Sequence, residues 1–388
     1  FQLSSVSMPA LSNVAYSAFR SCTNLTSVDM PLVTMLAKSV FEGCTRLTAV
    51  HMPLLTEVGE SAFRSCSSLA SVNMTSAKTV GLRAFRDCSS LVSVSMPLAT
   101  SVANEAFKAC WSLSSVNFPL VTSIEAFVFH SCSSLYTANI PSVTSLDVGA
   151  FIYCSSLSRV DMPVLSIVGD NALQLCANLT NVSMPIVSSV GYKSFLGCAS
   201  LASVNMPVVE SIGDSAFLNC SSLATLHAPL VTSLGEYTFS ECTNLTIVDM
   251  NLVVSVGSGA FHSCSSLTSA SMPLMTSMGY RAFYLCAGLT NVTIPMVTRV
   301  SAEAFVLCSS LASVNMPLVT DVGSFAFYQC SSLASVSMPL VTSVGLKSFQ
   351  ACSSLTSFNA PDQLLLPTSL TFIGNSSFFQ CTGLRGDL

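Results

Sequence analysis

Charged residues are scarce in this sequence. Only 9% of its 388 residues are Asp, Glu, Lys or Arg, and the formal net charge is −5. Proteins that bind nucleic acid neutralise phosphates with a basic surface. The composition therefore argues against a nucleic-acid partner.

Long hydrophobic runs are also missing, although 51% of the residues are hydrophobic and the mean hydropathy is +0.65. A membrane-spanning helix needs roughly 20 consecutive apolar residues. Here the apolar residues come in twos and threes among Ser and Thr, so we expect no membrane insertion. The sequence shows no signal peptide, lipidation motif or transit sequence, and it does not begin with Met.

Residues that could form a catalytic site are few and dispersed. The four histidines, His51, His130, His227 and His262, fall at two different positions of the repeat described below and lie far apart along the chain. A nucleophile, a base and an orienting group cannot be assembled from such positions. We therefore expect no enzymatic activity, no catalytic residue and no cofactor.

Cysteine, in contrast, recurs at every twenty-second residue. It stands at Cys22 and then at each further step of 22 up to Cys352, and a last cysteine follows at Cys381. A fixed period of this length is typical of a solenoid, in which each coil repeats the environment of the coil before it. The spacing predicts about 17 coils of about 22 residues.

One repeat unit runs from Cys330 to Ala351. Apolar residues recur 3, 6, 8, 11, 14, 18 and 19 residues after the cysteine, and Leu-x-x-Val-x-Met predicts a short strand that ends at a proline. Val-Thr-Ser-Val predicts a second short extended segment. The glycine at +15 indicates a turn with positive φ, and Ala-Phe-x-x-Cys indicates a single helical or 3₁₀ turn.

Stacked coils place identical residues on top of one another. We therefore expect a structural core ladder of cysteines and a parallel ladder of phenylalanines. The first members of these two ladders are Cys22, Cys44, Cys66 and Cys88, and Phe19, Phe41, Phe63 and Phe85.

The pattern resembles the BspA-like leucine-rich repeat, also called the Treponema pallidum type. The resemblance rests on Leu-x-x-Val-x-Met-Pro, Val-Thr-Ser-Val-Gly and Ala-Phe-x-x-Cys-x-x-Leu, and it covers essentially the whole chain. It implies a right-handed superhelix with a parallel β-sheet on the concave face, and short strands with single helical or 3₁₀ turns on the convex side. It also implies frequent use in secreted or surface proteins for adhesion and binding.

The repeat continues to both ends of the sequence. We therefore expect a single leucine-rich-repeat solenoid over residues 1–388 that is truncated mid-repeat at both ends. Residues 362–368 interrupt the spacing and predict a loop-like insertion before the last coil. This last unit is closest to the longer form of the family.

Three interpretations of the 17 cysteines remain open. A metal site needs several ligands that converge on one point, whereas each coil offers one thiol and no CxxC pair occurs. Disulfides between adjacent coils are possible by Cα separation, but parallel side chains in register lie too far apart at Cβ, and the number is odd. The third interpretation is a column of buried free thiols that act as small hydrophobic residues.

Variation between the repeats is concentrated at a few positions, chiefly +7, +16, +17, +20 and +21. At +20 the first coils form a basic column that is interrupted by Glu42. This edge is either simply solvated or contacts a partner, because Tyr and Arg are favoured at interfaces. The candidate partner-contact residues are Arg64, Arg86, Lys108, Tyr192, Lys193, Tyr237, Tyr280 and Arg281.

The expected strand face offers a second surface. Its positions +4, +5 and +7 are mostly Ser, Thr, Ala and Asn, which could dock a glycan, an extended polymer or another copy of the chain. The Thr/Ser pair at +12 and +13 could suit ice binding, although β-propensity and solubility explain it equally. Arg385-Gly386-Asp387 matches the integrin-binding tripeptide, and eight Asn-x-Ser/Thr sequons permit glycosylation.

These observations predict a non-enzymatic extracellular or cell-surface module for binding or adhesion, which could form part of a longer protein. Its partner would be a protein or glycan ligand, or copies of itself. The alternative is a structural subunit of a self-assembling extracellular filament or sheath. The repeats end without atypical polar caps, and the low charge causes little repulsion between chains that pack together. An intracellular scaffold is a third interpretation.

Overall fold

The computed structural model describes residues 3–360, 363–364 and 366–384. The chain winds into about 16 turns of about 22 residues, so the predicted solenoid of short parallel strands is confirmed. It divides into two compact units: unit 1 contains 1–187 and 197–201, and unit 2 contains 188–196 and 202–388. The single domain over 1–388 stays a prediction.

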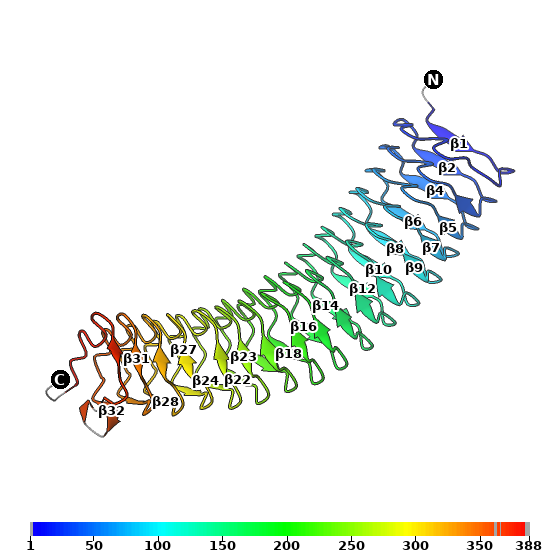
Figure 1. The fold of residues 1–388 in the computed structure, drawn as a ribbon. Helices are drawn as coiled ribbons and strands as arrows, with labels where there is room; N and C mark the ends of the chain where they lie inside the picture. The colour runs from blue at the N-terminus through cyan, green and yellow to red at the C-terminus, as the bar shows by residue number, and fades with distance from the viewer. Residues whose placement is uncertain (1–2, 361–362, 365, 385–388) are drawn as a thin grey trace. The chain divides into compact units, whose positions relative to one another are not determined.

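The first strand of each coil has three residues, except for a four-residue strand in the last such coil (Figure 1). Its central side chain points into the core and its flanking side chains face outward, because side chains alternate along a strand. In unit 1 these strands are β1 (Ser5–Ser7), β2 (Ser27–Asp29), β4 (Ala49–His51), β6 (Ser71–Asn73), β8 (Ser93–Ser95), β10 (Ser115–Asn117), β12 (Thr137–Asn139), β14 (Arg159–Asp161) and β16 (Asn181–Ser183). In unit 2 they are β18 (Ser203–Asn205), β20 (Thr225–His227), β22 (Ile247–Asp249), β24 (Ser269–Ser271), β26 (Asn291–Thr293), β28 (Ser313–Asn315), β30 (Ser335–Ser337) and β32 (Ser357–Ala360).

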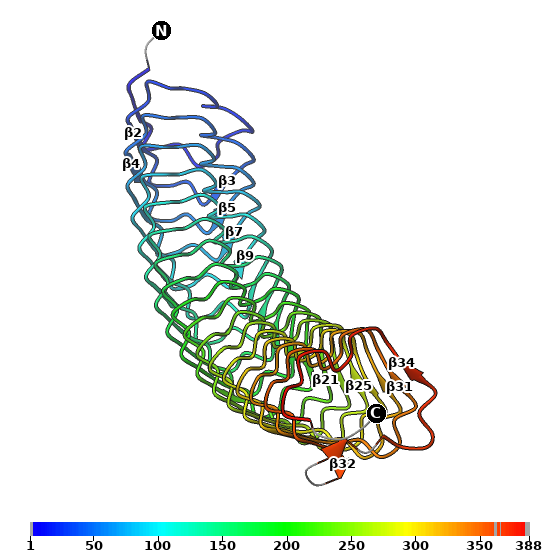
Figure 2. The same cartoon turned by 90° about the vertical axis from the view of Figure 1, so that its left-hand side faces the viewer.

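In the coils of β2 to β30, a second strand of two residues begins eight residues after the start of the first. The coil of β1 has only an isolated bridge at Val14 in this place, and in the last coil the insertion delays the second strand. In unit 1 the second strands are β3 (Met35–Leu36), β5 (Glu57–Val58), β7 (Thr79–Val80), β9 (Ser101–Val102), β11 (Ser123–Ile124), β13 (Ser145–Leu146) and β15 (Ile167–Val168). In unit 2 they are β17 (Ser189–Val190), β19 (Ser211–Ile212), β21 (Ser233–Leu234), β23 (Ser255–Val256), β25 (Ser277–Met278), β27 (Arg299–Val300), β29 (Asp321–Val322), β31 (Ser343–Val344) and β34 (Phe372–Ile373). Figure 2 shows β2 and β4 on one side of unit 1 and β3, β5, β7 and β9 on another.

The coils pair in strict register. Within unit 1, Val72 of β6 lies opposite Val94 of β8, and Val80 of β7 lies opposite Val102 of β9. Every such pair is parallel and joins residues 22 apart. A slip of one residue would turn the buried valines to solvent, so burial of one face fixes the register.

The predicted insertion at 362–368 contains a short strand of its own. β33 (Gln363–Leu364) pairs antiparallel with β32, whereas residues 362 and 365 lie outside the described part of the chain. After the insertion, β34 pairs with β31 across 29 residues, since Ser343 lies opposite Phe372. The inserted residues therefore lie outside the stack of coils, and the parallel strand pairing between coils continues after them.

The turn segment before each cysteine differs from the expected helical turn. No described residue there is helical, and each such segment holds residues at +17 and +21 with positive φ, such as Ser61 (54°) and Ser65 (59°). Two left-handed residues interrupt right-handed winding. The amides at +17, +19 and +21 bond instead to the neighbouring coil, as Phe63 N does to Ala84 O at 2.8 Å.

The glycine at +15 also plays a different role from the one expected. Gly81 and Gly345 do not have positive φ. A Cβ on Gly345 would lie 2.6 Å from the backbone nitrogen of Ser324 in the neighbouring coil, which is closer than a carbon atom can approach. Glycine is used here because the coils come so close together, not because of a left-handed turn.

The core consists of stacked columns of identical side chains. The phenylalanine rings of successive coils are parallel, with centroid separations such as 5.3 Å for Phe63 and Phe85, an offset arrangement that aromatic rings favour. Leu173 takes the place of a ring and is fully buried. Phe41, Phe63 and Phe85 are likewise fully buried, and Phe19 stacks on Phe41 at 5.4 Å.

The cysteines form a second column beside the rings. Cys44, Cys66 and Cys88 are completely buried and Cys22 is half-buried, and all described cysteines have free thiols. Each thiol from Cys44 to Cys352 donates to the carbonyl of the phenylalanine 25 residues earlier, or of Leu173 in one coil, with Sγ–O distances of 3.0–3.2 Å. Cys381, which follows the insertion, donates to Phe349 O, 32 residues earlier, at 3.0 Å. The cysteines thus act as hydrogen-bond donors as well as small core residues.

The left-handed positions generate a stability prediction. Ala109 has a φ of 59°, whereas Ala126 in the next coil does not have positive φ, and both are half-buried. Ala109→Gly should raise the free energy of unfolding by up to about 1 kcal/mol, because glycine adopts this conformation without strain. Ala126→Gly should lower it by about 0.5–1 kcal/mol through backbone entropy. Urea unfolding followed by circular dichroism measures both, and equal effects would contradict the assignment.

The thiol column generates a second prediction. Burial raises the pKa of Cys88 and of Cys132 to about 12, and only the thiolate reacts with disulfide reagents. A small aromatic disulfide at pH 8 should therefore modify half-buried Cys22 first and the fully buried thiols only after unfolding. Peptide mapping by mass spectrometry reports each site. Rapid native modification of Cys88 would show that the column is open to solvent.

Candidate functional site

The predicted partner-contact residues lie on one edge of the coils in each unit. We call the residues at +16, +17 and +20 the turn edge. Unit 1 contains Arg64, Arg86 and Lys108, and unit 2 contains Tyr192, Lys193, Tyr237, Tyr280 and Arg281. The three tyrosines are about two-fifths exposed, whereas the side chains of Arg86 and Lys108 are only about a quarter exposed.

In unit 1 the basic side chains are neutralised by two glutamates. Glu105 accepts from Arg83 at 2.7 Å, from Arg86 at 2.6 Å and from Lys108 at 3.3 Å. Burial alone would raise the pKa of Glu105, but the Arg83 hydrogen bond and the charges of Lys108 and Arg86 outweigh it and lower the pKa to about 2. This carboxylate is therefore ionised at any physiological pH.

Glu42 acts in the same way at the start of the column. Its carboxylate lies 3.3 Å from Arg20 Nε and 3.6 Å from Arg64 Nη1. The sequence showed Glu42 only as an interruption of the basic column, and the structure shows that it bridges the two arginines. The role of Glu105 was missed. Comparison of residues 22 apart would have found it, because Arg83 and Glu105 occupy the same position in successive coils.

In unit 2 the turn edge carries a compact aromatic and cationic cluster. The Arg281 guanidinium carbon lies 4.8 Å from the centroid of the Tyr280 ring and 4.9 Å from that of Tyr284. Glu303 accepts from Arg281 Nε at 2.7 Å and from the Tyr280 hydroxyl at 2.8 Å. His262 stacks on Tyr284 at 5.0 Å, and burial together with the Arg281 charge lowers its pKa.

Tyr192, Lys193 and Tyr237 do not join this cluster. Lys193 Nζ lies 4.7 Å from the centroid of the Tyr192 ring. The Tyr237 ring covers Gly259, where a Cβ would meet ring atom Cδ1 at 2.6 Å. Part of each tyrosine thus packs on its own solenoid. The arginines beside Glu42, Glu105 and Glu303 are thus charge-paired and the tyrosines are partly packed, so few polar groups of these clusters remain free for a partner.

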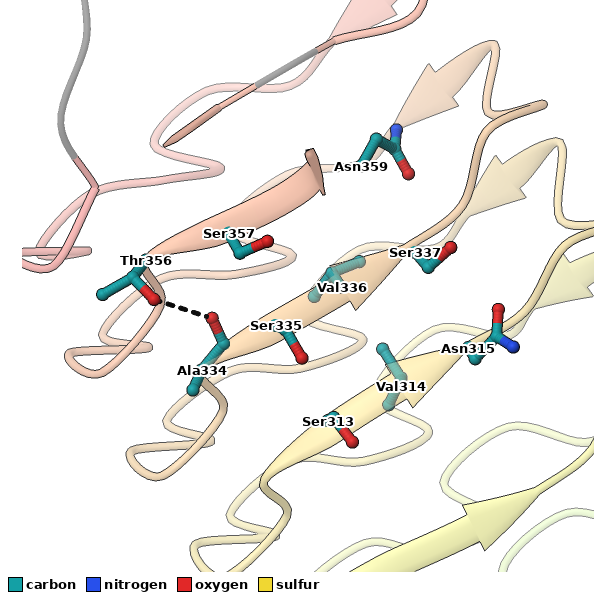
Figure 3. Close-up of a pocket in the computed structure, with 10 residues that line it drawn as sticks. All are labelled: Ser313, Val314, Asn315, Ala334, Ser335, Val336, Ser337, Thr356, Ser357 and Asn359. Atoms are coloured by element: carbon teal, nitrogen blue, oxygen red, sulfur yellow. Dashed lines mark hydrogen bonds between the residues drawn. The ribbon is translucent and has the colours of Figure 1, made fainter. Parts of the chain in front are cut away.

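The face formed by the three-residue strands, which we call the strand face, is different. In unit 2 a hollow of about 580 Å³ lies over β28, β30 and β32 (Figure 3). Its floor contains two rows of small polar side chains at +5 and +7, namely Ser313, Ser335 and Ser357, and Asn315, Ser337 and Asn359. A smaller hollow of about 330 Å³ lies on the same face of unit 1, lined by Arg159, Asp161, Asn181 and their neighbours.

Several of these polar groups have no intramolecular partner. Among the described residues, nothing hydrogen-bonds to the side chains of Ser313, Asn315, Ser335 or Ser337. Asn359, in contrast, accepts from Met338 N at 2.6 Å and donates to Met338 O at 3.3 Å. The hollow therefore holds free hydroxyl and amide groups next to one amide that is already bonded.

The regular threonines at +4 and +12 form hydrogen bonds to the backbone of the neighbouring coil. Thr342 Oγ1 donates to Thr320 O at 2.9 Å, and Thr342 N donates to the same oxygen at 2.7 Å. Thr48 does the same to Thr26, at 3.0 Å and 2.8 Å. We therefore attribute the regular threonines at +4 and +12 to coil stacking, which ice binding would not require.

The remaining sites expected from sequence are dispersed. His51 and His227 lie on the strand face, and His130 and His262 lie on the turn edge. In the described ranges, no three His, Cys, Asp or Glu residues come together in a way that could hold a metal ion, and no helix is long and apolar enough to cross a membrane. Arg385-Gly386-Asp387 lies outside the described residues.

Comparisons with known proteins agree with this geometry. A family model described as a BspA type leucine rich repeat region of six copies matches residues 2–102, 78–201, 188–312 and 276–386. No curated protein is similar enough in sequence to count as a match.

Among solved structures, a leucine-rich repeat protein from Bacteroides ovatus is 22% identical, with a TM-score of 0.68 over 96% of this chain and 92% of that one. A leucine rich cell surface protein from Faecalibacterium prausnitzii is 23% identical over 92% and 87%, with a TM-score of 0.38. The leucine rich repeat protein of T. pallidum is 26% identical over 47% and 80%, with a TM-score of 0.38. The Bacteroides structure supports the same fold.

The Glu105 network generates a pH-dependent prediction. Its pKa is lowered on folding from an ordinary value near 4.5, so its stabilising effect is complete above that pH and is lost as the pH falls towards 2. Glu105→Gln should lower the free energy of unfolding by about 1 kcal/mol at pH 7 and by much less near pH 2.

Glu57 is a suitable control for this measurement, because it is exposed and forms no ion pair with any described residue. Glu57→Gln should leave the urea midpoint unchanged at both pH values. If Glu105→Gln behaved like Glu57→Gln at pH 7, the network would contribute nothing to stability.

Proposed function

Because this chain belongs to the BspA type leucine rich repeat family, as its repeat pattern predicted, we propose that it is a non-enzymatic binding module that acts outside the cell or at its surface. The family and its fold are generally non-enzymatic, and leucine-rich-repeat folds commonly bind proteins or peptides. The partner we propose is a protein, and it docks on the strand face.

The choice of the strand face rests on the state of its polar groups. On the turn edge, Glu42, Glu105 and Glu303 already bind the neighbouring arginines. A partner would have to break those pairs, and their loss offsets any new contact. On the strand face the side chains of Ser313, Asn315 and Ser337 are exposed and form no hydrogen bond with any described residue, so a partner gains hydrogen bonds there without that cost.

The chemistry of the hollow favours a polypeptide over a sugar. Its ten lining residues are seven Ser, Thr or Asn residues with two valines and one alanine, and no ring is available to stack on a sugar face. It is also an open surface depression, unlike the enclosed clefts that hold small ligands. The amides and carbonyls of an extended protein segment match its hydroxyl and amide groups.

The column of buried thiols is compatible with an extracellular location of the protein. A thiol must ionise before it oxidises readily, and burial raises the pKa of Cys132 and of Cys242 to about 12. The cysteines are therefore protected without pairing as disulfides. This removes one objection to an extracellular location for a protein with so many free thiols.

A binding assay tests the proposal. Immobilised fibronectin, immobilised laminin and a glycan array are the probes, and the full chain is the analyte. We expect the wild-type chain to bind a protein probe. Asn315→Lys/Ser337→Lys should weaken that binding at least about tenfold, because two long cations fill the hollow and remove its donors and acceptors.

Unit 1 offers a matched control at the same repeat positions. Asn73 and Ser95 are exposed at +7 of two successive coils, as Asn315 and Ser337 are in unit 2. Asn73→Lys/Ser95→Lys should bind like the wild type, and so should Arg64→Gln/Arg86→Gln on the turn edge. Loss of binding only in the Arg64/Arg86 variant, or binding only to glycans, would contradict the proposal.

A further inference from the structure

A row of exposed aliphatic side chains runs along one corner of unit 2. Each member stands ten residues after its cysteine, three residues beyond the last residue of the three-residue strand. We call this row the aliphatic ridge. Its seven members are more than a third exposed, and they are Val208 (39%), Leu230 (41%), Leu252 (41%), Leu274 (47%), Met296 (43%), Leu318 (37%) and Leu340 (50%).

The fold does not require apolar residues at these positions. In each coil a tight turn joins the two strands, as where Val341 N donates to Met338 O at 3.2 Å. Met338 and Val341 point into the core and are fully buried, whereas Leu340 between them points outward. The third residue of such a turn is commonly polar, so leucine at this place stabilises neither the turn nor the core.

Two coils of unit 1 show that a polar residue is accepted at the ridge position. Ser76 and Ser142 stand there, and their hydroxyls donate to Pro53 O at 2.9 Å and to Pro119 O at 2.7 Å. These serines break the row in unit 1 into pairs of adjacent aliphatic residues. Within unit 2 the row is unbroken, because seven successive coils all keep an aliphatic side chain, and in the sequence this run is preceded by Val164 and Ile186 of unit 1.

The ridge forms a patch of substantial size. Seven coils at the spacing of paired strands extend over roughly 29 Å. Seven aliphatic side chains, each about two-fifths exposed, present on the order of 500 Å² of apolar surface, which is the size of patch that usually marks an interaction site. Val254, two residues beyond Leu252, is also 44% exposed and widens the patch.

Charge is nearly absent beside the ridge. The adjoining strands β21, β23 and β25 contain only Ser, Leu, Val and Met. Arg299 and Asp321 on β27 and β29 bind each other at 3.0 Å. The surroundings therefore contain no row of like charges that would repel an identical surface.

We propose that the ridge of unit 2 packs against the same ridge of a second copy of this chain. A second ridge has the same apolar character and the same spacing of side chains, so the two rows can interdigitate over their full length. Two patches of this size together approach the lower limit of a specific interface, roughly 1,200 Å². Contact between identical patches also closes the pair as a two-fold dimer.

This dimer is independent of the partner on the strand face, because the ridge and the hollow share no residue. Full overlap of the two ridges buries the most apolar surface. It places Leu274, the middle member, opposite Leu274 of the second copy whether the chains run parallel or antiparallel. Leu274 is therefore the residue at which the contact is best detected.

Sedimentation velocity of the full chain over a roughly hundredfold range of concentration is the first test. We expect a reversible monomer–dimer equilibrium. Leu252→Ser/Leu274→Ser/Met296→Ser should raise the dissociation constant at least about tenfold, because it removes the centre of the apolar patch. Ser76 and Ser142 show that coils fold with serine at this position, and circular dichroism verifies the fold.

A matched control lies in unit 1. Leu54→Ser/Leu98→Ser/Leu120→Ser changes the same repeat position in three coils of the broken row, and it should dimerise like the wild type. The proposal is overturned if the wild-type chain remains a monomer at every concentration. It is also overturned if the unit 2 variant dimerises normally, or if the unit 1 variant is the one that loses the dimer.

Cross-linking provides a second test. Leu274→Cys adds a thiol that is exposed, whereas the native thiols after Cys22 are buried. Mild oxidation should produce a covalent dimer of this variant, but not of the wild type or of Ser337→Cys on the strand face. A wild-type chain that stays monomeric but floats with phosphatidylcholine vesicles would assign the ridge to a lipid surface instead.

Discussion

Backbone hydrogen bonding between successive coils is the interaction on which this structure depends. Both strand series pair in parallel with an offset of 22 residues, which becomes 29 only across the insertion, and the amides of the turn segment bond to the neighbouring coil as well. No coil has enough apolar surface to fold alone, so each is ordered by the one beside it. The same bonds draw the coils so close that Gly345 has no room for a Cβ.

This close stacking explains the cysteines in chemical terms. The carbonyl of Phe63 accepts one hydrogen bond from Cys66 N and a second from the Cys88 thiol of the next coil. A buried carbonyl has two lone pairs, and the thiol fills the second place without the desolvation penalty of a stronger polar group. An alanine there would fill less space and donate nothing. The residue is thus suited to its position, and no metal or disulfide need be invoked.

The four surfaces of the solenoid differ in how far folding has used their functional groups. On the turn edge, acidic and basic residues of neighbouring coils pair, as Arg281 does with Glu303. At the threonine rows the hydroxyls bind carbonyls of the adjacent coil. The strand face over β28 and β30 and the aliphatic ridge of unit 2 have no such use in folding. They therefore carry the two proposals made for this protein.

The sequence alone determined the period, the family, the two short strands of most coils and the residues of the core columns, because a 22-residue repeat with invariant Leu and Cys, and with Phe replaced only at Leu173, admits few other folds. It did not reveal the left-handed residues at +17 and +21, since Ser, Arg, Leu and Phe all occur there and none has a preference for that conformation. Nor did it reveal that Glu105 neutralises Arg86, or that the residue after the proline points to solvent. Those properties depend on which atoms of neighbouring coils meet, and only the packing of one coil on the next decides that.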